Sequence, residues 1–318
     1  MSRRFRQIVM AAVVLTGSGS SAQLSPGQTS PQPVDALVVD ALGVQIKFTN
    51  PPQRLVSLAP SNTELLFALG VGSRIVGVTE YCDYPAAAVT IAKVASYSDM
   101  SLERVMSVSP DLVLAARGND LEGLKSLQQL GVPAVALDIQ TIPGLLSSIE
   151  SIGALLGVKS AAASLGQRIR QRVADVAESI RSTLPDERPR VMWGYWGDPI
   201  FTAGSGSLID HLIHEAGGIN VAAQAPLRWP QVSLESVVAW APDVLITTHL
   251  SSDYTDMAAE IEKLRGIDGW RSIPAVREGH IYYIEANLLT RSGPRMVDGL
   301  ERLAGIFKTI TPIKPTLD

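Results

Sequence analysis

The chain has 318 residues, a formal net charge of −4 at pH 7 and a single cysteine. A single hydrophobic core rarely grows beyond roughly 250–300 residues, so we expect more than one domain. The acidic balance excludes the basic footprint of a nucleic-acid-binding protein, and one cysteine excludes an internal disulfide.

Residues 1–22 have the pattern of a secretory signal peptide. Three arginines lie among the first six residues, an apolar run covers 8–15, and small residues end at Ala22. The run is shorter than the ~20 residues that a transmembrane helix needs. We therefore expect export and a mature protein that is not membrane-inserted. We also expect no lipid anchor, because the only cysteine, Cys82, lies far from Ala22.

Residues 23–52 begin with a stretch rich in Ser, Gln and Pro, which predicts a flexible leader followed by the first strands. Strands and helices then alternate over 53–157, which indicates a first lobe with a parallel sheet. Ser61 and Glu64 form a capping-box pattern at the start of one helix. The expected strands are 54–59, 75–78, 112–115 and 134–137, and the expected helices are 61–69, 102–108 and 121–130.

A similar order of elements returns over 186–318, which predicts a second lobe. Residues 101–114 align with 233–246 at a constant shift, and six of the fourteen positions are identical. We interpret this as two α/β lobes of related build. The expected strands are 191–193, 244–247 and 281–284, and the expected helices are 208–216 and 234–239.

Residues 158–185 connect the two lobes and predict one long helix. Its apolar residues recur in steps of three and four, from Leu165 through Ile169 to Ile180. Such a helix of about 25 residues would be roughly 38 Å long. Because it lacks a flexible Gly- or Pro-rich hinge, we expect only modest closure between the lobes.

Several segments in order along the chain resemble a known family. The chain is similar to the periplasmic substrate-binding proteins with one long connecting helix, which serve importers of cobalamin, haem and iron–siderophore complexes. The segments are Arg54–Leu65, Tyr81–Pro85, Leu102–Arg104, Ser109–Val113, Arg228–Ser233 and Ser292–Arg295. The resemblance implies an α/β fold of two Rossmann-like lobes with mostly parallel sheets, joined by one long α-helix, with a ligand cleft between them.

The resemblance also implies a function. It is greatest to the cobalamin-binding members, through the segment that contains Trp229. We therefore expect a monomeric periplasmic solute-binding component of an ABC transporter, which captures cobalamin and delivers it to an inner-membrane permease dimer. An iron–siderophore or haem carrier of the same fold is the alternative. Neither enzymatic activity nor a resident cofactor is implied.

The ligand residues implied by the resemblance are mostly aromatic: Tyr81, Tyr84, Tyr97, Phe201, Trp229 and Asn287. Tyr97 and Trp229 are separated by the same shift as the repeat, so they are expected to face each other across the cleft. Flat aromatic groups suit a corrin or porphyrin ring, because they bury a large area with few rotatable bonds. A place in the hydrophobic core remains the alternative for each aromatic residue.

Glu103 and Glu235 occupy equivalent positions in the repeat, each two residues after a serine that can cap a helix. The resemblance implies that they dock on arginines of the permease dimer. The alternative is local, since a carboxylate in the first turn of a helix is stabilised by about 0.3–1 kcal/mol.

Three rival readings remain. A metal carrier would use histidines, but all four lie in the second half: His211, His214, His249 and His280. An anionic iron chelate would require arginines, for which the candidates are Arg117, Arg228, Arg291 and Arg295. A secreted hydrolase is disfavoured, because the mature sequence contains neither a Gly-x-Ser-x-Gly nor a His-Glu-x-x-His motif.

Overall fold

A computed structural model describes residues 36–39, 45–96, 100–248 and 257–310. The predicted signal peptide, Tyr97 and His249 lie outside these residues. None of the helices in the described ranges is both long and apolar enough to span a membrane. The first described element is a hairpin of β1 (Ala36–Val39) and β2 (Gln45–Phe48), which pair antiparallel.

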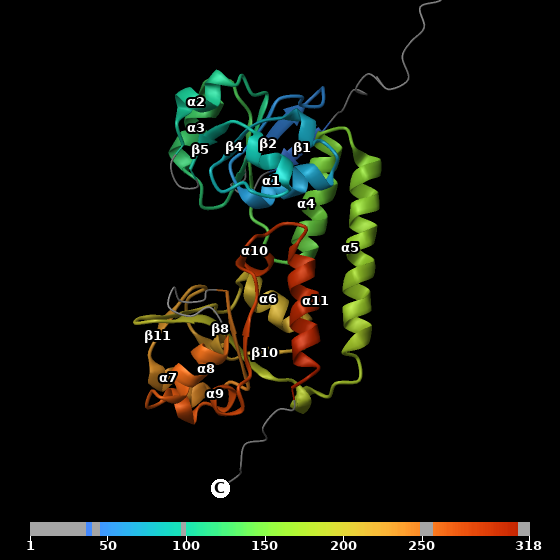
Figure 1. The fold of residues 1–318 in the computed structure, drawn as a ribbon. Helices are drawn as coiled ribbons and strands as arrows, with labels where there is room; N and C mark the ends of the chain where they lie inside the picture. Colours follow the sequence, from blue (N-terminus) through green and yellow to red (C-terminus); the bar gives the residue numbers. More distant parts are fainter. Residues whose placement is uncertain (1–35, 40–44, 97–99, 249–256, 311–318) are drawn as a thin grey trace, which may run out of the picture. The chain divides into compact units, whose positions relative to one another are not determined.

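The first lobe is built on a parallel sheet that is covered on both faces (Figure 1). Leu112 and Leu114 point to one hydrophobic cluster, and Val113 and Ala115, which alternate with them, point to another. This alternation buries both faces, as is usual for parallel sheets. The strand order is β5 (Lys93–Ala95), β4 (Ile75–Thr79), β3 (Leu55–Ser57), β6 (Leu112–Ala116) and β7 (Ala134–Leu137), and the helices are α1 (Pro60–Ala68), α2 (Leu102–Ser107) and α3 (Leu121–Gln129).

The second lobe has a mixed sheet whose central strands are buried on both faces. Strands β8, β10, β12 and β13 pair in parallel, whereas β9 and β11 are antiparallel additions at one edge. The order is β11 (Gln231–Val232), β9 (Ile200–Thr202), β8 (Arg190–Trp196), β12 (Val244–Thr247) and β13 (Ile281–Tyr283), with β10 (Ile219–Asn220) beside β8. The helices are α6 (Leu208–Glu215), α7 (Leu234–Trp240), α8 (Met257–Arg265), α9 (Pro274–Glu278), α10 (Ala286–Leu289) and α11 (Met296–Phe307). The predicted α/β fold class is confirmed.

The repeat extends to individual contacts. In the first lobe, the N–H of Arg54 donates to Asp111 at 2.8 Å and its guanidinium donates to the carbonyl of Val108 at 2.6 Å. In the second lobe, Arg190 makes the same contacts with Asp243 at 2.9 Å and with the carbonyl of Trp240 at 2.6 Å. Even the left-handed backbone recurs, with φ of 46° at Ser109 and 40° at Ala241. In each lobe, the aspartate of the Pro-Asp motif therefore binds the start of a neighbouring strand, which is β3 in the first lobe and β8 in the second.

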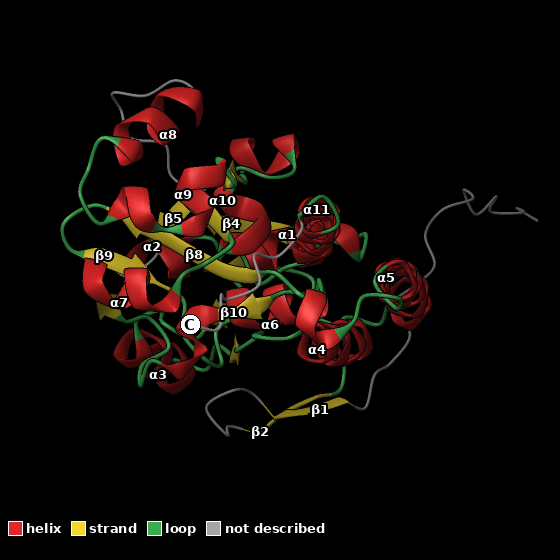
Figure 2. Ribbon diagram, turned by 90° about the horizontal axis from the view of Figure 1, so that it is seen from below, coloured by secondary structure: helices red, strands yellow, loops and turns green. Residues whose placement is uncertain are grey.

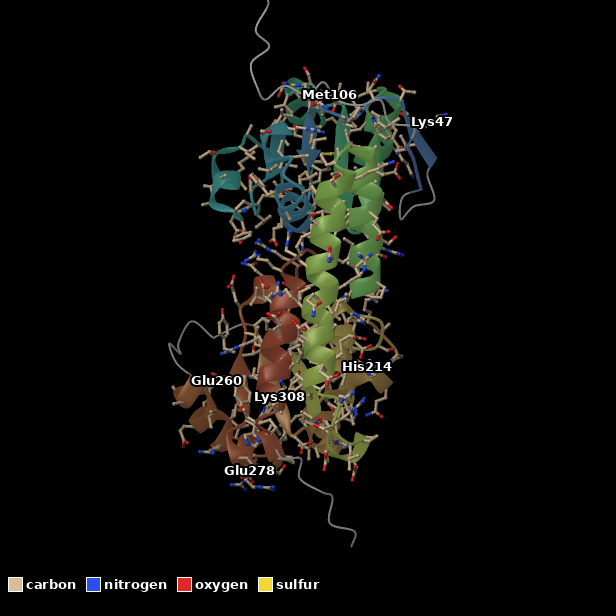
Figure 3. The ribbon with its side chains drawn as sticks, turned by 90° about the vertical axis from the view of Figure 1, so that its right-hand side faces the viewer. Lys47, Met106, His214, Glu260, Glu278 and Lys308 are labelled. Carbon is tan, nitrogen blue, oxygen red and sulfur yellow. The ribbon has the colours of Figure 1, made fainter. Side chains whose placement is uncertain are left out.

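Helix α5 (Lys159–Ser179) extends along both lobes, whereas α4 (Ile142–Leu155) lies beside the first lobe (Figures 1 and 2). Helix α5 packs beside both α4 and α11, as the face in Figure 3 shows. Arg170 bonds Glu150 of α4 at 2.6 Å, and Arg172 bonds Asp298 of α11 at 2.6 Å. The predicted connecting helix, 158–185, is longer than the observed one. Helix α5 ends at Ser179, whose Oγ donates to the carbonyl of Val176.

Candidate ligand cleft

A cavity of about 680 Å³ lies between the two lobes. This volume falls within the usual range for small-molecule sites. The first lobe contributes the start of α1 and loops that follow β4, β6 and β7, at the carboxyl ends of a parallel sheet, where such folds bind ligands. The second lobe contributes the start of α6 and two loops. The second-lobe residues are Leu208, Arg228, Trp229, Leu289, Thr290, Arg291 and Ser292.

Two of the predicted aromatic residues line this cavity, one from each lobe. Tyr81 follows β4 and is 56% exposed, and Trp229 is 49% exposed. The Trp229 ring packs edge-on against the buried Trp193, with 5.9 Å between centroids. The Trp229 loop is held by a 2.9 Å bond from the N–H of Gly204 to the carbonyl of Arg228. Trp229 therefore presents an exposed aromatic ring, held in place by Trp193 and by the backbone bond of its loop.

The remaining predicted ligand residues that the structure describes do not line this cavity. Phe201 lines a second cavity in the second lobe, of about 520 Å³, with Tyr195 and Trp196. The Tyr84 ring lies under the Arg295 guanidinium, 3.9 Å from its carbon to the ring centroid. Asn287 donates to Glu285 at 2.9 Å.

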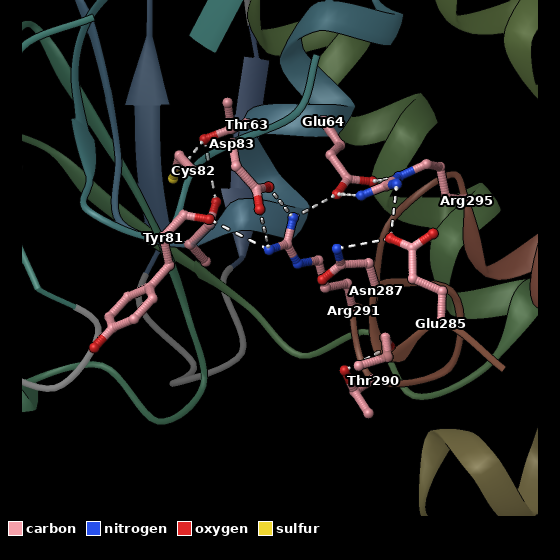
Figure 4. Close-up of polar contacts among 12 residues, drawn as sticks. Thr63, Glu64, Tyr81, Cys82, Asp83, Glu285, Asn287, Thr290, Arg291 and Arg295 are labelled. Atoms are coloured by element: carbon pink, nitrogen blue, oxygen red, sulfur yellow. Dashed lines mark hydrogen bonds and ion pairs between the residues drawn. The ribbon is translucent and has the colours of Figure 1, made fainter. Parts of the chain in front are cut away.

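Four charged residues join the lobes beside the cavity, and we call them the interlobe ion cluster: Glu64, Asp83, Arg291 and Arg295 (Figure 4). Arg295 bonds both oxygens of Glu64, at 2.7 and 2.9 Å. Arg291 bonds Glu64 at 3.3 Å and Asp83 at 2.6 Å. The Glu64 side chain is only 2% exposed. The cluster therefore connects α1 and the loop after β4 with the loop that precedes α11.

The electrostatics of the cluster favour its charged forms. Hydrogen bonding from Arg291 lowers the pKa of Asp83 despite partial burial. The hydrogen bond to Glu64 raises the pKa of Arg295. Glycine at position 293 leaves room between the loop before α11 and helix α1. A Cβ there would lie 3.2 Å from the carbonyl oxygen of Ser61 and 3.5 Å from Glu64.

The capping box predicted for Ser61 and Glu64 is wrong. Helix α1 begins at Pro60, its N-cap Ala59 receives no side-chain hydrogen bond, and Glu64 is bound by Arg295 instead. The pattern Ser-x-x-Glu is shared by capping boxes and by unrelated helices, so the local sequence carried no signal for the partner. The only indication in the sequence of a role for Arg295 was that the Ser292–Arg295 segment resembles the family.

Two of the three described histidines contact backbone atoms of the protein. His211 Nε2 on α6 accepts a 3.0 Å hydrogen bond from the backbone N–H of Ile142, at the start of α4. The Nδ1 of His280 lies 3.3 Å from the carbonyl of Asp243. Within residues 45–96, 100–248 and 257–310, no three His, Cys, Asp or Glu side chains form a group that could hold a metal ion.

The partly buried ring of His211 should make the free energy of unfolding depend on pH. Burial lowers its pKa from the ordinary 6.5, so the folded state holds the neutral ring that Ile142 requires. The unfolded state takes up a proton first as the pH falls, so stability is lost below about pH 6.5, with a slope of at most about 1.4 kcal/mol per pH unit. Urea unfolding between about pH 7.5 and about pH 5.5 measures this slope.

We expect His211→Gln to reduce that slope, because glutamine accepts the same bond without titrating. An unchanged slope in His211→Gln would show that other groups cause the pH dependence.

Glu103 and Glu235 are both exposed in the first turns of α2 and α7. The predicted serine caps are confirmed, since Ser101 and Ser233 each accept a 3.3 Å bond from the backbone of their helix. A hydrogen bond from Ser233 lowers the pKa of Glu235. Each lobe thus presents a carboxylate to solvent at an equivalent position.

Comparison with known proteins assigns the family. Residues 55–288 match the model of the periplasmic binding protein family, and the chain belongs to this family. It is 31% identical over 304 residues to the uncharacterized ABC transporter substrate-binding lipoprotein YvrC of Bacillus subtilis, covering 93% of this chain and 94% of the relative.

Solved structures with the same fold bind different ligands according to their names. The periplasmic vitamin B12 binding protein BtuF of Vibrio cholerae has a TM-score of 0.71 and 27% identity, covering 81% of this chain and 98% of BtuF. The periplasmic heme-binding protein RhuT from Roseiflexus sp. RS-1 has a TM-score of 0.70 and 27% identity, with the same two coverages of 81% and 98%. The predicted class, a solute-binding protein of an ABC transporter, is confirmed by these likenesses.

Proposed function

We propose that the protein binds cobalamin in the interlobe cleft and delivers it to an inner-membrane ABC permease, without catalysing a reaction. The observation that carries this proposal is the cavity lined by Trp229 from one lobe and Tyr81 from the other. Two exposed aromatic faces bury a large, flat ring at low conformational cost. The likeness to the solved structure that is named as a vitamin B12 binding protein supports the same ligand.

The charge balance of the cleft also supports a ligand without strong negative charge. Of the four arginines considered for an anionic iron chelate, Arg291 and Arg295 are paired within the interlobe ion cluster, and Arg117 bonds Asp138 at 2.9 Å. Their charges are largely compensated by carboxylates. Arg228 alone among the four lines the cavity without an ion pair to another described residue.

Haem is the second candidate, because the likeness to RhuT is as close as that to BtuF. A porphyrin would use the same aromatic faces, with its carboxylates near Arg228. Ligand binding to the folded state alone raises the unfolding free energy by about 2.7 kcal/mol at a hundredfold excess over Kd. A thermal-shift screen with cobalamin, cobinamide, haem and ferric siderophores therefore separates the candidates. We expect the largest shift with cobalamin, and no shift with either corrinoid would remove cobalamin as the ligand.

We also propose that residues 1–22 direct export, that the mature protein acts in the periplasm as a monomer, and that Glu103 and Glu235 dock on the permease. Replacing both with glutamine should leave ligand affinity in solution unchanged and impair uptake in cells by at least about tenfold, because each lobe loses one charged contact. Glu122→Gln, an exposed glutamate of α3, provides a control for the loss of one surface charge. Reduced affinity with normal uptake would assign the two glutamates to the pocket instead.

A further inference from the structure

The second lobe contains a cavity of about 520 Å³ that shares none of its described lining residues with the interlobe cavity. Three aromatic side chains line it, Tyr195, Trp196 and Phe201. Tyr195 of β8 and Phe201 of β9 are directly paired across the two strands, so both side chains lie on the same face of the sheet. The face of an aromatic ring carries partial negative charge and attracts cations. The walls of this cavity therefore suit a ligand with positive charge.

The carboxylate of Glu260 on α8 also lines this cavity, and Figure 3 labels it in the second lobe. The residue is 6% exposed. Its Oε1 accepts a 3.1 Å hydrogen bond from Trp196 Nε1, whereas its Oε2 is buried and has no hydrogen-bond partner among the described residues. Buried polar groups are nearly always paired, because leaving one unpaired costs stability. An unpaired carboxylate oxygen in the wall of a cavity indicates a hydrogen-bond donor that arrives with a ligand.

The position of this carboxylate is fixed before a ligand binds. Trp196, which donates to it, packs edge-on against the buried Trp270, with 6.1 Å between ring centroids. The start of a helix stabilises a negative charge, which suits the place of Glu260 in the first turn of α8. The other charged residue of the described lining, Lys263, is exposed, so water screens its ammonium group. The buried charge of the cavity is therefore negative.

We propose that this cavity, the Glu260 pocket, binds a small organic molecule through a primary ammonium group. The ammonium donates an N–H to Oε2 of Glu260, and this bond is charge-assisted and therefore stronger than one between neutral groups. Tyr195, Trp196 and Phe201 contact the carbon atoms beside the ammonium. A carboxylate ligand would be repelled by Glu260, and a quaternary ammonium has no N–H for Oε2. The Glu260 pocket does not rest on the proposed function, because its described residues do not line the interlobe cavity.

Glu260→Gln tests the pocket with phenethylamine as the probe, which is protonated at neutral pH and carries an apolar ring. We expect the unmodified protein to bind it in titration calorimetry, and the variant to bind it at least about tenfold more weakly, because glutamine keeps the shape and loses the charge. Phenylacetate, an anion of similar size, should not bind. The trimethylated probe, which has no N–H, should bind more weakly than the primary amine. No heat of binding with phenethylamine at up to about 10 mM would overturn the pocket.

Glu262→Gln is the matched control, since Glu262 is an exposed glutamate of the same helix outside the described cavity lining, and it should leave the affinity unchanged. If Glu260→Gln is poorly folded, Phe201→Leu removes one ring at an exposed position and should lower the affinity about two- to fivefold. Equal affinity in Glu260→Gln and the unmodified protein, or equal binding of the primary and trimethylated amines, would overturn the pocket. Binding that is weakened by Trp229→Ala and not by Glu260→Gln would place the amine in the interlobe cavity and overturn the pocket as well. Each of these results leaves the proposed function in place.

Discussion

Glu64→Gln is expected to lower the free energy of unfolding by about 3–5 kcal/mol, because it removes one partner of a buried ion pair. The Glu64 side chain is 2% exposed and that of Arg295 is 16% exposed, so the arginine left behind regains little solvation. The amide of glutamine accepts only part of the bidentate contact that Arg295 makes. Urea unfolding followed by circular dichroism measures the loss.

Two controls sharpen this test. Glu122→Gln removes an exposed partner of Lys125 and should cost no more than about 1 kcal/mol. The double variant Glu64→Met with Arg295→Met removes both charges and should recover much of the loss, since apolar groups of similar volume replace a buried pair at little cost. A loss below about 1 kcal/mol in Glu64→Gln would show that the cluster does not hold the lobes together.

Trp229→Ala is expected to weaken ligand binding by about 1–3 kcal/mol, or roughly 5- to 150-fold. The ring is 49% exposed in the cavity wall, so a ligand that covers it gains the full area of one aromatic face. Trp229→Phe should retain most of the affinity. Titration calorimetry with the ligand found in the thermal-shift screen measures both variants.

Leu130→Ala, which truncates an exposed apolar side chain at the end of α3, controls for nonspecific effects. Equal affinity in Trp229→Ala and the unmodified protein would place the ring outside the contact with the ligand. Because Trp229 also packs against Trp193, the Tm of the ligand-free variant should be measured in parallel.

The parts of the fold that depend on local patterns were predictable. The shift between residues 101–114 and 233–246 identified helices α2 and α7 and strands β6 and β12, because each element carries its own cap and apolar residues. Helix α4 was not predicted. Pro143 and Gly144 near its start are typical of a turn, although proline also fits the first turn of a helix.

The parts of the site that depend on distant contacts were not predictable. Glu64 and Arg295 are 231 positions apart, and no local pattern links them. The same holds for Glu260, whose unpaired oxygen becomes apparent only once its surroundings are folded. Trp229 and Tyr81 were placed on the cavity through the family resemblance, and Tyr97 lies outside the described residues.

The close approach of Gly293 to Ser61 constrains how the lobes can move. A Cβ at position 293 would lie 3.2 Å from the carbonyl oxygen of Ser61, so a side chain at this position would crowd α1, and Arg295 resists separation of the lobes through its bond to Glu64. We therefore expect the lobes to tilt about this contact rather than to slide past each other. Such a tilt would change the angle between the two sides of the cavity, which contain Tyr81 and Trp229. The start of α1 would stay in place beside the loop that contains Gly293. We therefore expect a partner that opens the cleft to act at positions remote from this contact, such as the exposed starts of α2 and α7.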